Sequence, residues 1–116
     1  MKNYNRMFID TYGNGYDGDI RFETNSNASA VYLLGGQYES FTCYLTAGPG
    51  TKTGSVMNAE IYGDDQLLFT QDGITKETGP VLVELDVTGI SNLKVVTSRS
   101  SDNYDAYLYL VGDLLK

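Results

Sequence analysis

Apolar and polar residues alternate with a period of two along several short runs of this 116-residue chain. The clearest run, Tyr38 to Thr46, places Phe41, Cys43 and Leu45 on one side and their polar or amphipathic neighbours on the other. The run from Val81 to Thr88 alternates in the same way. Because successive side chains of a β-strand point to opposite faces of its sheet, each run predicts a strand with one buried face.

Clusters of Gly, Asn, Asp and Ser separate such runs at intervals of about ten residues. The predicted strands are Met7–Tyr12, Asp19–Thr24, Ala30–Leu34, Tyr38–Thr46, Val56–Tyr62, Leu67–Thr70, Val81–Thr88, Leu93–Ser98 and Ala106–Val111. No apolar stripe of helical period extends past two turns, and glycines interrupt the chain too often for a long helix. The pattern predicts an all-β fold, an antiparallel β-sandwich or a barrel. No linker or repeat divides residues 1–116, which predicts a single domain.

Two glycine-containing segments predict turns. Gly35 and Gly36 allow a positive φ, so we expect a tight connection that folds Tyr38–Thr46 back beside Ala30–Leu34. The segment Gly63-Asp64-Asp65-Gln66 lies between two strand-like runs and predicts a β-hairpin.

The composition excludes several kinds of site. The chain has no His, so imidazole metal ligands, Ser-His-Asp triads and Cys-His pairs are excluded. The single Cys, Cys43, cannot form an internal disulfide, and its place among apolar residues predicts a buried thiol. Eight Lys and Arg against 15 Asp and Glu give a net charge of −7, which disfavours nucleic acid and anionic membranes as partners.

The chain carries no apolar run of the length that spans a bilayer, about 18 residues. Its first residues lead directly into a strand-like run, and no signal peptide is visible. Ten Tyr, 13 Gly and no Trp suit a β-rich extracellular module with hydrogen-bonding loops. The chain could be an intracellular protein or a module of a longer exported protein. The composition favours the exported module, located outside the cell or at its surface.

Three segments resemble a known family: Tyr32–Phe41, Ala59–Leu68 and Pro80–Val95. Their pattern of strands and turns is similar to that of the NPCBM family, which is related to family 51 carbohydrate-binding modules. The resemblance implies a jelly-roll sandwich of the galactose-binding-domain-like kind. It also implies a non-catalytic module of an exported bacterial protein, linked to a catalytic domain, that binds a glycan or polysaccharide weakly, with galactose-type sugars favoured.

Two loops contain the residues that sugar recognition requires, an aromatic ring for the apolar sugar face and planar polar groups for adjacent hydroxyls. By analogy with family 51 modules, the expected sugar contacts are Arg99, Asp102, Asn103 and Tyr104, before the final strand. Tyr16 and Asp17, in the loop of residues 12–19, are the second choice. The alternative for both loops is a solvated strand connection whose short polar side chains bond the local backbone.

The same loops offer oxygen ligands for a hard cation. Asp17 with Asp19, and Asp102 with Asp105, place carboxylates at close spacing, although neither segment matches an EF-hand loop. Related jelly-roll modules hold a structural calcium ion, so one Ca²⁺ is an expectation from the resemblance. Catalysis is not expected, because Asp64 and Asp65 are adjacent turn residues rather than carboxyls flanking a cleft.

A second function remains open beside glycan binding. The same sandwich could be a structural or protein-interaction module, because exposed Tyr side chains suit protein interfaces as well as sugars.

Overall fold

The computed structural model describes residues 20–23, 28–48, 51–99 and 106–116 of the chain. The strands among these residues are β1 (Ile20–Glu23), β2 (Ala28–Leu33), β3 (Ser40–Ala47), β4 (Met57–Gly63), β5 (Gln66–Ile74), β6 (Val81–Asp86), β7 (Asn92–Arg99) and β8 (Tyr107–Leu115). The strand predicted at Met7–Tyr12 lies outside the described residues. No helix long and apolar enough to cross a membrane occurs in the described part of the chain.

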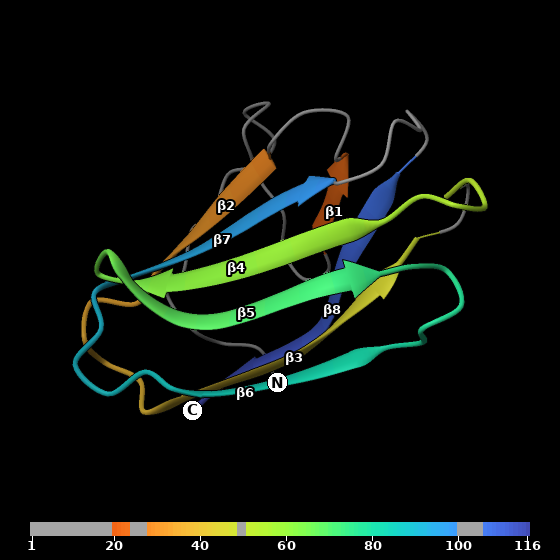
Figure 1. The fold of residues 1–116 in the computed structure, drawn as a ribbon. Coiled ribbons are helices and arrows are strands. Elements are labelled where there is room, and N and C mark those ends of the chain that lie inside the picture. The colour runs from red at the N-terminus through yellow and green to blue at the C-terminus, as the bar shows by residue number, and fades with distance from the viewer. Residues whose placement is uncertain (1–19, 24–27, 49–50, 100–105) are drawn as a thin grey trace.

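The strands form two four-stranded sheets that lie face to face (Figure 1). The strand order is β1-β8-β3-β6 in one sheet and β2-β7-β4-β5 in the other. All neighbouring strands are antiparallel. The predicted antiparallel β-sandwich is therefore confirmed. Only the connection between β4 and β5 joins neighbours of the same sheet; every other connection between described strands leads to the opposite sheet.

The turn between β4 and β5 is the hairpin predicted from the sequence. Gly63 pairs with Gln66, and the two residues between them have left-handed backbones, with φ of 47° at Asp64 and 71° at Asp65. Asp tolerates this conformation better than most residues, and two successive left-handed residues match the right-handed twist of the flanking strands.

The prediction that Gly35 and Gly36 fold Tyr38–Thr46 back beside Ala30–Leu34 is wrong. Both glycines have positive φ, 62° and 72°, as expected, but β2 and β3 belong to different sheets. The turn bonds instead to the β6–β7 connection: the Leu34 and Gly35 amides donate to the Ser91 carbonyl at 2.7 and 3.1 Å. These bonds continue the β2–β7 pairing, so the glycines carry the chain across the sandwich.

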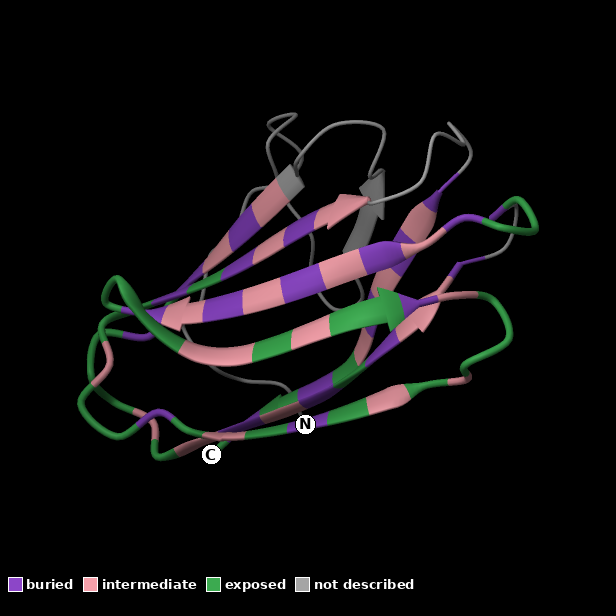
Figure 2. Cartoon of the chain, viewed as in Figure 1, coloured by how far each residue is buried: buried purple, intermediate pink, exposed green. Residues whose placement is uncertain are grey.

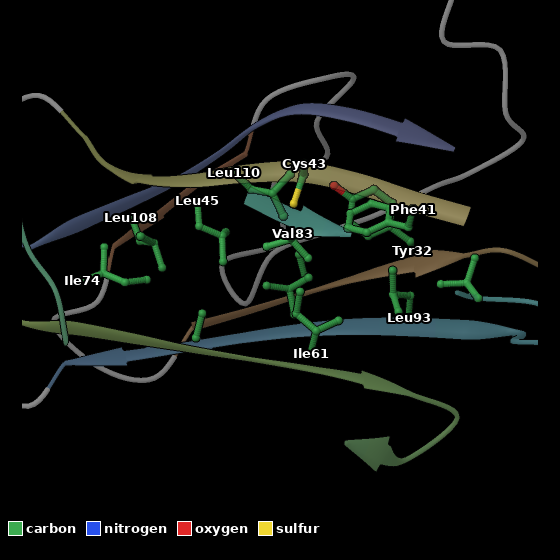
Figure 3. Close-up of a cluster of buried hydrophobic side chains, with 14 of the residues drawn as sticks. Tyr32, Phe41, Cys43, Leu45, Ile61, Ile74, Val83, Leu93, Leu108 and Leu110 are labelled. Carbon is green, nitrogen blue, oxygen red and sulfur yellow. The ribbon is translucent and has the colours of Figure 1, made fainter. Parts of the chain in front are cut away.

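The core lies between the two sheets and contains the inward-facing residues of their strands. Buried and part-exposed residues alternate along β4, as Figure 2 shows, and the alternation predicted for β3 and β6 is confirmed. Figure 3 shows members of this core, among them Tyr32, Phe41, Cys43, Leu45, Ile61, Ile74, Val83, Leu93, Leu108 and Leu110. The rings of Tyr32 and Phe41 meet edge to face across the sandwich, with centroids 5.1 Å apart at 67°.

Cys43 is a buried, free thiol, as predicted. Burial, together with the charge of Asp113, raises the pKa of Cys43 to about 12. The thiol therefore stays protonated and unreactive at physiological pH. Asp113 is itself buried and accepts a hydrogen bond of 3.1 Å from the Tyr32 hydroxyl, which ties β8 to β2 through the core.

Candidate functional site

Strand ends from both sheets meet at one end of the sandwich, here called the loop end (Figure 1). The register places Ala47 of β3 beside Leu108 of β8, and Met57 of β4 beside Arg99 of β7. β7 ends and β8 begins at this end, so it is where the predicted sugar-binding loop leaves and rejoins the sheets. Arg99 is half-buried there as the last residue of β7.

The other predicted site residues lie outside the described residues. These are Asp102, Asn103 and Tyr104 for the sugar, Tyr16 and Asp17 for the second choice, and Asp17, Asp19, Asp102 and Asp105 for calcium. The structure therefore places Arg99 alone among them. Within the described ranges, no group of three or more Asp, Glu or Cys residues lies close enough together to hold a metal ion.

Side-chain hydrogen bonds hold the strand ends together at the loop end. Thr51 is buried, donates to the Tyr107 carbonyl at 3.1 Å and accepts from the Tyr107 amide at 3.2 Å. The side-chain Oδ1 of Asn58 accepts a hydrogen bond from the Gly73 backbone N–H at 3.3 Å, and its Nδ2 donates to Ser98 Oγ at 3.5 Å. These two bonds link β4 to both of its neighbours, β5 and β7. These hydrogen bonds therefore fix the first residue of β8 and the last residues of β7 relative to the neighbouring strands.

A shallow groove on the outer face of the sheet β2-β7-β4-β5 is a second site of interest. It consists of two hollows of about 350 and 300 Å³ that share Tyr62, Asp65 and Lys94. We call it the sheet groove and define it by its lining residues: Val31, Leu33, Glu60, Tyr62, Asp64, Asp65, Asn92, Lys94 and Val96. Its rim is the β4–β5 turn.

Hydrogen bonds fix two of the groove's polar residues. The Tyr62 hydroxyl donates to Glu60 Oε1 at 3.1 Å, and this bond to a carboxylate raises the pKa of Tyr62. Asp64 accepts from the backbone amides of Ser91 at 3.0 Å and Asn92 at 2.9 Å, which lowers the pKa of Asp64. Asp64 is therefore a structural link between the β4–β5 turn and the start of β7.

Sequence reasoning missed this groove. The outward positions of β4 and β7 are visible in the alternation, as Glu60 and Tyr62 on one strand and Lys94 and Val96 on the other. Their proximity follows only from the register, in which Tyr62 pairs with Lys94 and Glu60 with Val96. No local signal predicts which two strands become neighbours when the connections cross between sheets.

Comparison with solved structures places the fold among family 51 carbohydrate-binding modules (CBM51). The CBM51 of a Clostridium perfringens GH95 protein, solved with methyl-galactose, matches with a TM-score of 0.74 and 19% identity. The second CBM51 of C. perfringens ZmpB, solved with GlcNAc and the INT domains, matches at 0.72 and 15%. The tandem CBM51 modules of a family 98 glycoside hydrolase from Streptococcus pneumoniae match at 0.69 and 16%.

These matches cover 96%, 96% and 99% of the present chain, in the same order. The chain spans 79% of the first structure but only 25% and 36% of the other two, which contain further domains. No curated protein matches the sequence. The sequence profile of the NPCBM/NEW2 domain matches residues 14–111, which is most of the chain. The chain therefore belongs to the NPCBM/NEW2 domain family, as its strand and turn motifs predicted.

Proposed function

We propose that this domain is a non-catalytic glycan-binding module that acts as an accessory domain of an exported bacterial protein. The observation that carries the proposal is its family membership, joined to a fold that matches sugar-binding modules over nearly its whole length. One of those modules was solved with methyl-galactose and another with GlcNAc. Galactose is therefore the first sugar to test, and GlcNAc the second.

The proposed sugar site is the β7–β8 connection at the loop end. Arg99 is the last residue of β7, and Asp102, Asn103 and Tyr104 follow it in the sequence. Tyr104 would stack on the pyranose ring while the other three bond its hydroxyls. Tyr16 and Asp17 remain the second choice. One stacked ring and a few hydrogen bonds supply about 3–6 kcal/mol, which corresponds to dissociation constants of about millimolar to tens of micromolar.

Weak binding of this size suits a tether. In the ZmpB protein of C. perfringens, two CBM51 domains accompany an M60 catalytic domain. A module joined to a catalytic domain raises the local concentration of that domain at a glycan-bearing surface, so millimolar affinity is useful when it acts together with further contacts. We propose the same arrangement for the parent protein of this chain, outside the cell or at its surface.

Replacing Tyr104 tests the sugar site. Tyr104→Ala should weaken binding of methyl-galactose by about 1–3 kcal/mol, about 5- to 150-fold, because the stacking face is lost. The Tm should hardly change if the ring is exposed. Isothermal titration calorimetry measures the affinity, and thermal unfolding measures the Tm. Tyr44→Ala is the matched control, since Tyr44 is 45% exposed on the outer face of the sheet β1-β8-β3-β6.

A loss of several kcal/mol in unfolding free energy for Tyr104→Ala would make Tyr104 a core residue and move the site elsewhere. A glycan array on which the wild-type domain binds no sugar would contradict the function itself and favour the protein-interaction alternative.

A structural calcium ion at Asp17 and Asp19 or at Asp102 and Asp105 is also proposed. When Ca²⁺ binds only the folded domain, it stabilises that domain by RT ln(1 + [Ca²⁺]/Kd). The Tm should therefore be higher in millimolar calcium than in EDTA, and equal magnesium should have a smaller effect because Mg²⁺ dehydrates reluctantly. Identical melting curves in EDTA and calcium would remove the ion from the proposal.

A further inference from the structure

We propose that the sheet groove is a second carbohydrate site, separate from the loop end, that binds a neutral glycan chain of at least two pyranose residues. The inference rests on the proposed function, because it extends glycan binding to a face that the loop site does not include. It starts from the sheet register. Val31, Lys94 and Tyr62 occupy one row across β2, β7 and β4, and Leu67 of β5 completes the row.

Tyr62 supplies a ring that is positioned before a ligand arrives. The side chain lies on the outer face of β4 and lines both hollows. Its hydroxyl donates a hydrogen bond of 3.1 Å to Glu60 Oε1, which favours this orientation of the ring. Sugar stacking on a ring that is already ordered loses less conformational entropy than stacking on a mobile one.

Three polar side chains of different chemistry surround that ring with their groups unused. Asp65, Asn92 and Lys94 are exposed and, among the described residues, none of these side chains forms a hydrogen bond or an ion pair. The Asp65 carboxylate accepts hydrogen bonds, the Lys94 ammonium donates them, and the Asn92 amide can donate and accept. Adjacent sugar hydroxyls require such a mixture around one aromatic ring.

The backbone that presents these groups is fixed. The Asp64 carboxylate binds the Ser91 and Asn92 amides, and the Asp64 amide donates to the Asn92 carbonyl at 3.0 Å. The β4–β5 turn that carries Asp65 is thus joined to the first residue of β7. The backbone on the turn side of the groove is therefore fixed relative to β7.

The charge and the shape of the groove select the class of glycan. Glu60, Asp64 and Asp65 place three carboxylates around the single ammonium of Lys94, and the whole chain carries −7. A uronic or sialic acid would be repelled, whereas a neutral hexose or N-acetylhexosamine would not. Because the two hollows meet at Tyr62, a sugar in one leaves room in the other for the next residue of the chain.

The test is a ¹⁵N–¹H NMR titration of the whole domain with a panel of neutral oligosaccharides that includes lactose and N,N′-diacetylchitobiose. We expect at least one to shift the amides of Tyr62, Asp65 and Lys94. The same shifts should persist in Tyr104→Ala, where the loop site is removed. Sialyllactose should cause no greater shift at these amides than lactose, since its carboxylate adds repulsion.

Two groove variants test the contacts. Tyr62→Ala and Lys94→Ala should each weaken the binding seen at the groove amides by about tenfold, while Tyr44→Ala should not. Lys94 is exposed, so its variant keeps the fold and remains informative if Tyr62→Ala is unstable. Shifts confined to residues near Arg99 would overturn the inference and leave the proposed function standing. Shifts at the groove alone would support the inference and reject the loop site. No shift with any neutral sugar would overturn both.

Discussion

An aspartate in place of Val83 should leave no folded domain. Val83 is fully buried on β6 and pairs with Cys43 of β3, and both residues belong to the core between the two sheets. An unpaired charge in such a site costs several kcal/mol, and a domain of this size has about 5–15 kcal/mol in total. Asp113 already places a carboxylate close enough to raise the pKa of Cys43, so the new charge also meets repulsion. Circular dichroism should show no cooperative unfolding transition for Val83→Asp.

Leu82→Asp is the matched control for that variant. Leu82 is the preceding residue of the same strand, but its side chain is 49% exposed on the outer face. The same substitution one position away should therefore unfold with a Tm close to that of the wild type. A stable Val83→Asp domain with an unchanged Tm would mean that this face of β6 is not in the core.

Removing the Phe41 ring should cost about 3–5 kcal/mol of unfolding free energy, the range for a large aromatic side chain cut back to Ala in a packed core. Phe41 is fully buried and packs edge to face on Tyr32, whose hydroxyl holds the Asp113 carboxylate. The cavity in Phe41→Ala therefore also loosens the ring whose hydroxyl donates a hydrogen bond to the buried Asp113 side chain. Urea denaturation measures the difference in free energy, with the slope m checked for a change in two-state behaviour.

Tyr44→Ala on the same strand serves as the comparison for Phe41→Ala. Tyr44 faces outward, 45% exposed, so we expect a loss of about 1 kcal/mol or less. If both variants lose the same free energy, the two faces of β3 do not differ in burial as the structure has them.

Local features of the fold were predictable because their causes are local. The alternation of Phe41, Cys43 and Leu45 follows from a period of two and one buried face, and the turn at Asp64 and Asp65 follows from residues that accept a left-handed backbone. In each case the residues that form the feature also determine it, so the sequence is sufficient.

The arrangement of strands was not predictable in the same way. The glycines at 35 and 36 have the expected φ, yet β2 pairs with β7 rather than β3. β8 continues to Leu115, past the predicted end at Val111, through a β-bulge in which Cys43 faces both Gly112 and Asp113. Both outcomes depend on partners far away in the chain.

The candidate sites divide along the same line. The candidate sugar-binding residues of the β7–β8 loop are contiguous and visible in the sequence, whereas the residues of the sheet groove come from three separate segments. Lys94 and Tyr62 are 32 residues apart and meet only through the pairing of β4 with β7. A binding loop made of consecutive residues can be predicted from the sequence. A surface made of residues from several strands can be identified only once the pairing register of those strands is known.

The crossing of the connections also governs how the domain reaches its native state. β1, the first described strand, pairs only with β8, the last, and β8 in turn pairs with β3. Apart from the β4–β5 hairpin, every pair of the described strands must close a long loop before it gains any stability. Sandwiches of this kind fold in milliseconds to seconds. During synthesis, the sheet that contains β1 cannot close until the final strand has left the ribosome. The domain is therefore expected to fold after its last strand is made, as one unit rather than strand by strand.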